Sequence, residues 1–233
     1  MAKPHPAEGL EWHPPPRMIT EYHPPTDPLV VLHHDADIVV VEKPSGLLSV
    51  PGKPAALADC LEGRVREAFP GTLLIHRLDL ETSGVMVFAL NKPAQKHINL
   101  QFERRRVQKT YIARVAGQVE QDSGEIDLPL IVDWQRRPMQ KVCWETGKPS
   151  RTLWRVLERE VGATRVELTP ETGRSHQLRV HLKELGHPIL GDPFYAPDDV
   201  FDAADRLQLH AKELTLRHPN GGNWVTFRAD CPF

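Results

Sequence analysis

The sequence predicts one mixed α+β domain built around a mostly antiparallel sheet. Three observations lead to this fold class. Short β-branched runs are numerous, only three segments show helical spacing of apolar residues, and strands and helices do not alternate one for one as in a doubly wound parallel fold. The chain has 233 residues, of which 40% are hydrophobic and 26% charged, enough for one sizeable core.

The first 28 residues contain 8 of the 22 prolines. Proline fixes φ and lacks a backbone donor, so this density excludes helix interiors and sheet ladders. Residues 1–28 are therefore predicted to form an extended tail or a strap on the domain, with Trp12 and Tyr22 as candidate anchors.

Apolar and β-branched runs bounded by Asp, Gly or Pro predict the strands. These runs are residues 29–35, 37–44, 71–79, 84–90, 109–117, 151–160, 164–170, 207–219 and 224–229.

Helices are expected at 56–69, 92–106 and 173–186. The second has a proline near its start and a basic last turn, which suits the helix dipole. In the third, Thr172 is placed to cap the N-terminus and Gly186 to end the helix. Arg174 is expected in its first turn, beside backbone N–H groups that can bind an anion.

The charges are distributed unevenly along the chain. A net charge of −2 does not by itself indicate a nucleic-acid partner. However, residues 104–114 hold five basic residues and no acid, and residues 134–155 hold six basic residues and one acid. If these spans fold together they form a basic face suited to phosphate; the alternative is a solvated surface of salt bridges.

Several functional classes find little support. No apolar run reaches the roughly 18 residues of a membrane helix, and the N-terminus lacks a signal-peptide core. The three cysteines are far apart, which argues against disulfides and CxxC metal sites. The 12 histidines prompt a metal-dependent hydrolase as an alternative, but HExxH-like spacing is missing. We expect a cytoplasmic protein without metal or cofactor.

Three polar segments could carry chemistry. HRLDLETSG (76–84) lies between two expected strands, where an active-site loop is often built, although a surface Arg–Asp pair would look the same. RRRVQKTYIARV (104–115) places a tyrosine just past an arginine cluster, suited to base stacking or to an ordinary core position. TPETGRSHQLRVHLKELGHPILGDPFY (169–195) aligns Arg174, Leu178 and His181 on one helix face.

A protein-kinase interpretation of HRLDL fails. A leucine separates Arg77 from Asp79, no GxGxxG precedes the lysine of VVVEKP, and no DFG follows.

Taken together and in this order, the three segments resemble the RluA family of pseudouridine synthases. VVEKPSGLLSVPG (40–52) resembles the stretch that precedes the family's first motif. The resemblance runs from about Leu29 to the C-terminus. It implies the pseudouridine synthase fold with an active-site cleft over residues 29–233, preceded by the proline-rich tail and without an S4-type RNA-binding domain.

The resemblance also implies an activity. Such enzymes flip a uridine out of structured RNA, break its N1–C1′ bond and rejoin the ribose to C5 without a redox change. The short N-terminal region and PLIVDWQRRPMQKVCWETGKPS (129–150) resemble the branch that modifies both a tRNA anticodon stem-loop (uridine-32 type) and a 23S rRNA hairpin (uridine-746 type). We expect a monomer with no obligate protein partner.

By the same resemblance, Asp79 is the catalytic aspartate. Arg174 occupies the family's arginine position and would keep Asp79 ionised. Tyr111 would stack on the uracil and take the C5 proton.

The resemblance further implies substrate contacts. Arg77 would enter the stack that the uridine leaves, His76 would shape the loop, and Leu178 and Ile112 would pack under the site. The candidate phosphate contacts are Arg104, Arg105, Arg106, Lys109, Arg136, Arg137 and Lys141. A catalytically silent RNA-binding module with the same basic face is the alternative function, which the presence of Asp79, Tyr111 and Arg174 disfavours.

Overall fold

The computed structural model describes residues 11–18 and 21–233, and the rest of the predicted tail lies outside the described residues. The strands are β1 (Val30–His34), β2 (Ile38–Lys43), β3 (Leu73–Leu74), β4 (Ser83–Ala89), β5 (Gln108–Ala116), β6 (Ser123–Asp127), β7 (Leu130–Val132), β8 (Gln140–Val142), β9 (Arg151–Glu160), β10 (Ala163–Pro170), β11 (Leu209–Arg217) and β12 (Trp224–Arg228). The helices are α1 (Leu61–Ala68), α2 (Lys92–Glu103), α3 (Gln177–Glu184) and the short α4 (Asp198–Phe201), with 3-10 turns at Ala55–Leu57 and Trp134–Arg136.

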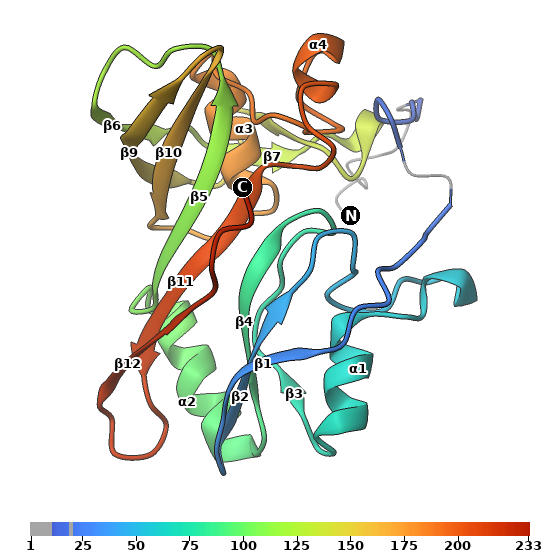
Figure 1. The fold of residues 1–233 in the computed structure, drawn as a ribbon, viewed down its shortest axis with the longest axis vertical. Helices are drawn as coiled ribbons and strands as arrows, with labels where there is room; N and C mark the ends of the chain where they lie inside the picture. The colour runs from blue at the N-terminus through green and yellow to red at the C-terminus, as the bar shows by residue number, and fades with distance from the viewer. Residues whose placement is uncertain (1–10, 19–20) are drawn as a thin grey trace, which may run out of the picture.

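The main sheet has ten strands in the order β1-β2-β4-β11-β5-β10-β9-β6, with β3 on β4 and β12 on β11. Strands β7 and β8 form a separate hairpin. Among the described strands, β4 and β11 are the one parallel pair, and the others pair antiparallel. The predicted mixed, mostly antiparallel α+β fold is therefore confirmed, and Figure 1 shows β5 and β11 as long strands that extend from the region of α3 to the region of α2.

The sheet has two halves: β1 to β4 form one, and β5, β6 and β9 to β12 form the other. They meet at a short junction between β4 and β11. Only Ser83 with His210 and Gly84 with Ala211 pair there. Gly84 has φ +117°, and a Cβ at this position would lie 2.2 Å from the carbonyl oxygen of Ala211. Glycine is therefore required where the two backbones come together, four to five residues after Asp79.

Three apolar clusters hold these elements in place. One lies between the β2–β4 sheet, α2 and the far half of β11, with Ile98 and Leu214 among its members. A second lies on the other face of β2–β4, where Leu61 and Val65 of α1 pack. The third joins β5, β10 and α3, and Tyr111 packs against both the second and the third. The sheet junction thus brings β5, α3 and the loop before β4 together.

The sequence analysis did not predict β6, β7, β8 or α4, and several of the elements that it did predict have other ends in the structure. Residues 71–79 form only the two-residue β3 and then a loop, because their later backbone groups bind side chains rather than a neighbouring strand. Helix α1 begins at Leu61, after Cys60 at its N-cap. Helix α2 ends at Glu103, so the arginines expected in its last turn follow the helix.

The predicted helix 173–186 is shortened at its N-terminus. His176 has φ 52°, in the left-handed region, so α3 starts only at Gln177. Thr172 does not cap it: its hydroxyl donates to Gln177 Oε1 and accepts from the backbone N–H of Arg151. Gly186, with φ +91°, directly follows the C-cap as predicted.

The described part of the tail lies along the domain. Tyr22 donates its hydroxyl to the carbonyl of Asp59 at 2.9 Å and accepts from the N–H of Leu48 at 3.0 Å. Arg17 pairs with Asp198 and donates to the carbonyl of Ala196. Tyr22 is thus an anchor, whereas Trp12 is 47% exposed.

Candidate active site

Asp79 lies in the loop between β3 and β4, which is held from below by the segment after β2. Ser49 donates its hydroxyl to the carbonyl of Leu78 at 2.6 Å and accepts from the N–H of Leu78 at 3.1 Å. The N–H of Gly46 donates to the carbonyl of Leu80 at 3.0 Å. The carbonyls on both sides of Asp79 are therefore fixed, while its own side chain stays 29% exposed.

Lys43 supports the same loop. It is fully buried, and its ammonium donates to three carbonyls, those of Pro44 (2.9 Å), Leu47 (2.6 Å) and Leu80 (2.8 Å). Burial lowers the pKa of Lys43 to about 7, against the opposing effect of Glu81 and Asp79. This lysine joins the two segments that resemble the family's first motif and its preceding stretch.

Arg179 of α3 is the cation nearest to Asp79. Its Nη1 lies 3.6 Å from Asp79 Oδ2, while Nε and Nη2 donate to the two carboxylate oxygens of Asp192 at 2.8 and 2.6 Å. Arg179 is 3% exposed and Asp192 fully buried. Burial alone would lower the pKa of Arg179, but the charges of Asp192 and Asp79 raise it above the ordinary value, so the guanidinium stays protonated.

A histidine–tyrosine pair lies near the same carboxylate oxygen of Asp79, and Arg179 lies over the ring of this tyrosine. His176 Nε2 is 3.9 Å from Asp79 Oδ2, and His176 Nδ1 is 2.7 Å from the hydroxyl of Tyr195. That hydroxyl also accepts from the N–H of Gln140 in β8 at 2.8 Å, which fixes the phenol beside the imidazole. Burial lowers the pKa of His176.

Tyr111 of β5 lies at the same place. Burial, and next the charge of Asp79, raises the pKa of its phenol far above the ordinary value. Leu178 of α3 is 7% exposed and belongs to the apolar cluster that Tyr111 packs against. Ile112 is buried but, as the next residue along the strand, points to the opposite face of β5, so it does not lie with Tyr111.

The two remaining residues of this loop are the half-buried His76 and the exposed Arg77. His76 stacks on Phe102 at 5.0 Å, and its Nε2 accepts from the N–H of Val87 at 3.1 Å. Burial lowers the pKa of His76 to about 3, so the ring is neutral and structural. Arg77, two residues before Asp79 in the same loop, is exposed.

Arg174 does not lie where the sequence argument placed it. It precedes α3, and its backbone N–H donates to Gln177 Oε1. Among the described residues, the ion pairs to Asp79 come from Arg179 and His176. The helical period counted from residue 173 put Arg174, Leu178 and His181 on one face, so Arg179 was not considered. The sequence signal that could have identified Arg179 is an arginine among the apolar residues of α3, followed by Asp192 as a possible partner.

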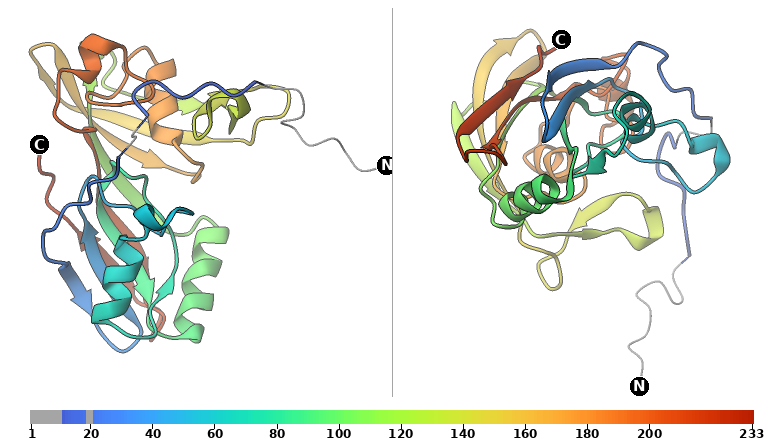
Figure 2. Two further views of the ribbon diagram at one scale, coloured as in Figure 1. Left: turned by 90° about the vertical axis from the view of Figure 1, so that its right-hand side faces the viewer. Right: turned by 90° about the horizontal axis from the view of Figure 1, so that it is seen from below.

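The candidate phosphate contacts are at the surface, with one exception. Arg104, Arg105 and Arg106 are exposed after α2, as are Arg136, Arg137 and Lys141 on the β7–β8 hairpin. Figure 2 shows α2 and this hairpin on the same side of the molecule. Lys109 is half-buried, and burial lowers its pKa to about 8.

Charge pairing on the hairpin is partial. Arg136 and Lys141 lie 3.1 and 3.5 Å from Asp133, and Arg137 lies over the ring of Trp134.

In the described part of the chain, no group of three metal-ligating side chains includes Asp79. No helix there is long and apolar enough to cross a membrane.

The chain is similar to known proteins over most of its length. Residues 37–184 match the family model described as RNA pseudouridylate synthase. The curated "Dual-specificity RNA pseudouridine synthase RluA" of Yersinia pestis is 53% identical over 192 residues, which is 82% of this chain and 93% of the relative. The protein of the same name from Escherichia coli (strain K12) is 52% identical, covering 82% of this chain and 88% of the relative.

Solved structures agree with these matches. "Human RNA Pseudouridylate Synthase Domain Containing 1" superposes with a TM-score of 0.75 at 33% identity, covering 88% of this chain and 84% of that one. "Human RNA Pseudouridylate Synthase Domain Containing 4" gives 0.70 at 27% identity, with 87% and 88% covered. Fold, sequence and the set of side chains around Asp79 lead to one conclusion: the chain belongs to the RluA family of RNA pseudouridine synthases, enzymes that isomerise uridine in RNA.

Proposed function

We propose that this enzyme uses Asp79 as its catalytic carboxylate, with Arg179 as the buried cation that keeps it ionised. The observation that carries the proposal is the 3.6 Å contact between Arg179 Nη1 and Asp79 Oδ2, made by an arginine already fixed on Asp192. A protonation-independent positive charge beside a carboxylate favours its ionised form. Arg179 replaces Arg174 in this role because the sequence argument rested on a helix start that the fold does not have.

An ionised carboxylate suits both routes open to the reaction. It can attack C1′ as a nucleophile, or it can stabilise the positive charge that develops when the N1–C1′ bond breaks and then accept the C2′ proton, which it returns as the C5–C1′ bond forms. In either route the uracil leaves, turns and forms the C5–C1′ bond. The C5 proton is then lost and N1 gains one, so the reaction is redox-neutral.

Tyr111 is proposed to stack on the flipped uracil and to take part in C5 proton removal. Because its pKa is raised, the phenol enters the reaction neutral. A neutral phenol can accept the C5 proton only if it gives its own proton to another group at the same time. Besides burial, the charge of Asp79 raises the pKa of Tyr111.

RNA is proposed to bind across the side of the molecule that carries α2 and the β7–β8 hairpin, with their exposed basic residues. Arg77, two residues before Asp79, is exposed and is proposed to enter the stack that the uridine leaves. The exposed cations orient the backbone without reading the sequence, and loop shape then selects the substrate.

We further propose two substrates, a uridine of a tRNA anticodon stem-loop and a uridine of a 23S rRNA hairpin. The support is the similarity to relatives named dual-specificity synthases, at 53 and 52% identity. The chain is proposed to act as a monomer, with residues 29–233 as the catalytic domain.

Tritium release from RNA labelled at uracil C5 tests this function. Each stem-loop transcript is offered separately to wild type and to Asp79→Asn, with and without a chelator. We expect release from both RNAs by wild type and a loss of at least about 1,000-fold in the variant, equivalent to about 4 kcal/mol of barrier. RNA binding by the variant, measured by filter retention, should stay near wild type.

The other outcomes are informative. Release from one RNA alone keeps the enzyme class and narrows the substrate. Binding without release by wild type supports a silent RNA-binding module, and turnover retained by Asp79→Asn refutes the role of Asp79.

A further inference from the structure

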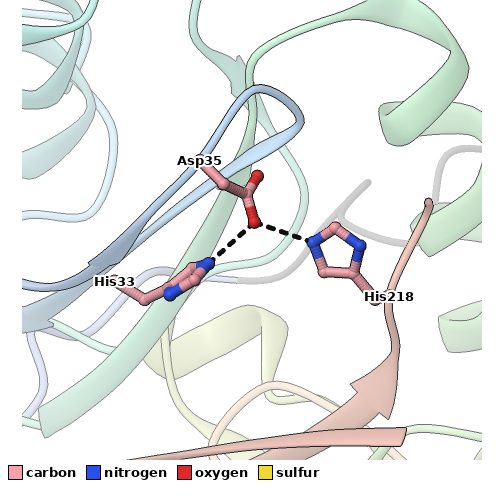
Figure 3. A group of neighbouring side chains, drawn as sticks. All are labelled: His33, Asp35 and His218. Carbon is pink, nitrogen blue, oxygen red and sulfur yellow. Dashed lines mark hydrogen bonds and ion pairs between the residues drawn. The ribbon is translucent and has the colours of Figure 1, made fainter. Parts of the chain in front are cut away.

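A cluster of three side chains lies away from the active site and is not used by the proposed chemistry. His33 of β1, Asp35 of the β1–β2 turn and His218, just after β11, direct their polar atoms at one point (Figure 3). His33 Nε2 and His218 Nε2 lie 2.7 and 2.9 Å from the same oxygen, Asp35 Oδ2. We propose that this cluster is a structural binding site for a divalent transition-metal ion, with Zn²⁺ as the best fit.

The geometry supports three-fold ligation. One atom from each residue lies within 4.8 Å of the other two. In a tetrahedral zinc site with bonds of about 2.0–2.1 Å, ligand atoms are about 3.3 Å apart. The two nitrogen–oxygen distances therefore need to lengthen by about half an ångström, which small side-chain rotations supply. The partly exposed side chains leave a fourth position for water.

The carboxylate is prepared for one bond to a metal. Asp35 Oδ1 accepts from the N–H groups of Asp37 at 2.8 Å and Ile38 at 3.0 Å, which fixes the side chain and leaves Oδ2 directed at the two imidazoles. In the metal-free protein each ring donates an Nε2–H to Oδ2. To bind a metal through Nε2, each ring must instead carry its proton on Nδ1.

Both backbone groups of Asn220 contact His218 Nδ1. The carbonyl oxygen lies 3.0 Å away and can accept a proton from Nδ1 in the metal-bound tautomer, while the N–H lies 3.1 Å away and donates to Nδ1 in the metal-free one. A histidine that ligates a metal through one nitrogen usually donates the other N–H to such an acceptor. Two neutral imidazoles and one carboxylate suit Zn²⁺ and its neighbours, whereas Mg²⁺ and Ca²⁺ prefer oxygen ligands throughout.

The position of the cluster explains what a metal would do there. Beyond their short junction, β4 pairs with β2 and β3 while β11 pairs with β12, so the two halves of the sheet separate. His33 and Asp35 belong to one half and His218 to the other. A shared ion would tie the β1–β2 and β11–β12 hairpins together at that end, about 20 Å along β2 from the loop of Asp79.

Zinc titration of the full chain tests the site. After chelation and dialysis, titration calorimetry with Zn²⁺ in a buffer that contains excess Mg²⁺ should show one equivalent of Zn²⁺ bound. The melting temperature, measured separately, should rise with zinc concentration. His218→Ala and Asp35→Asn should lose this equivalent and the thermal shift. His23→Ala is the matched control: His23 lies 3.2 Å from Glu21, an exposed histidine–carboxylate pair outside the cluster, and its loss should change neither.

Cobalt as a probe keeps the test decisive if the variants fold poorly. Wild type with one equivalent of Co²⁺ should show the visible absorption of a four-coordinate nitrogen and oxygen site. A thiolate charge-transfer band would place the ion on a cysteine instead and overturn the proposal. Equal zinc binding by wild type and His218→Ala, displacement by Mg²⁺, or the lack of a stoichiometric site in wild type would overturn it as well.

Discussion

Asp79 and the surface arginines belong to the same proposed RNA-facing side but are held in different ways. Asp79 is surrounded by buried partners: Arg179 at 3% exposure, Lys43 at 0% and the hydroxyl of Ser49 beneath its loop. By contrast, Arg104, Arg105 and Arg106 follow α2 as exposed side chains.

This difference separates two physical tasks. Transition-state stabilisation depends on charges that are held in fixed positions in a site from which water is excluded. The loss of any one buried partner of Asp79 should therefore lower the reaction rate by a large factor. Phosphate binding depends on the number of cations near the backbone, so each exposed arginine contributes a small and similar share. Substitutions should therefore have large effects at Asp79 and small, additive ones at the surface.

The largest effect after Asp79 itself is expected at Arg179. Arg179→Lys keeps a positive charge but loses the fork that binds Asp192 through two atoms. We expect kcat to fall about 100-fold, about 2.7 kcal/mol of barrier, in C5 tritium release.

Arg174→Lys is the matched comparison for that variant. Its cost should stay below about tenfold, or about 1.4 kcal/mol, because the guanidinium of Arg179 remains against Asp79. Circular dichroism establishes that both variants are folded. A larger loss in Arg174→Lys than in Arg179→Lys would return the role to Arg174.

A smaller effect, on stability, is expected at Lys43. Lys43→Met leaves the carbonyls of Pro44, Leu47 and Leu80 without their donor. We expect the free energy of unfolding, measured with urea, to fall by about 2–3 kcal/mol. Lys92→Met, which removes an exposed lysine, should cost less than about 0.5 kcal/mol. Similar values for the two variants would show that Lys43 does not hold the loop.

The pKa of Lys43 adds a pH dependence to this comparison. Its folded pKa of about 7 lies below the ordinary 10.5, so the unfolded chain binds more protons between these values. Stability from this group therefore rises as pH increases from about 7 to about 10. The difference in unfolding free energy between wild type and Lys43→Met should grow over that range, and a flat difference would contradict the lowered pKa.

The smallest effect per residue is expected at the surface. Arg105→Ala should weaken RNA binding only a few-fold at moderate salt and reduce the slope of log affinity against log salt by about 1. The triple change of Arg104, Arg105 and Arg106 should reduce the slope by about 3 while sparing kcat at saturating RNA. Filter binding over a salt series measures both, and an unchanged slope would exclude these arginines from the RNA surface.

The fold class and most strands could be predicted from the sequence, because alternation and β-branched runs are local signals that the sheet does not override. The sequence also indicated Asp79, Tyr111 and the basic segments, since these lie in contiguous motifs. It could not place the start of α3, because a left-handed His176 stabilised by its contact with Tyr195 is a tertiary effect.

Tertiary structure alone decided which groups meet. Arg179 and Asp192 are 13 residues apart, and both lie about 100 residues or more from Asp79, yet they form one buried charge group. His218 reaches Asp35 across a separation of 183 residues. Such pairings depend on how the two halves of the sheet join at Gly84, and a linear pattern contains no information on the distance between them.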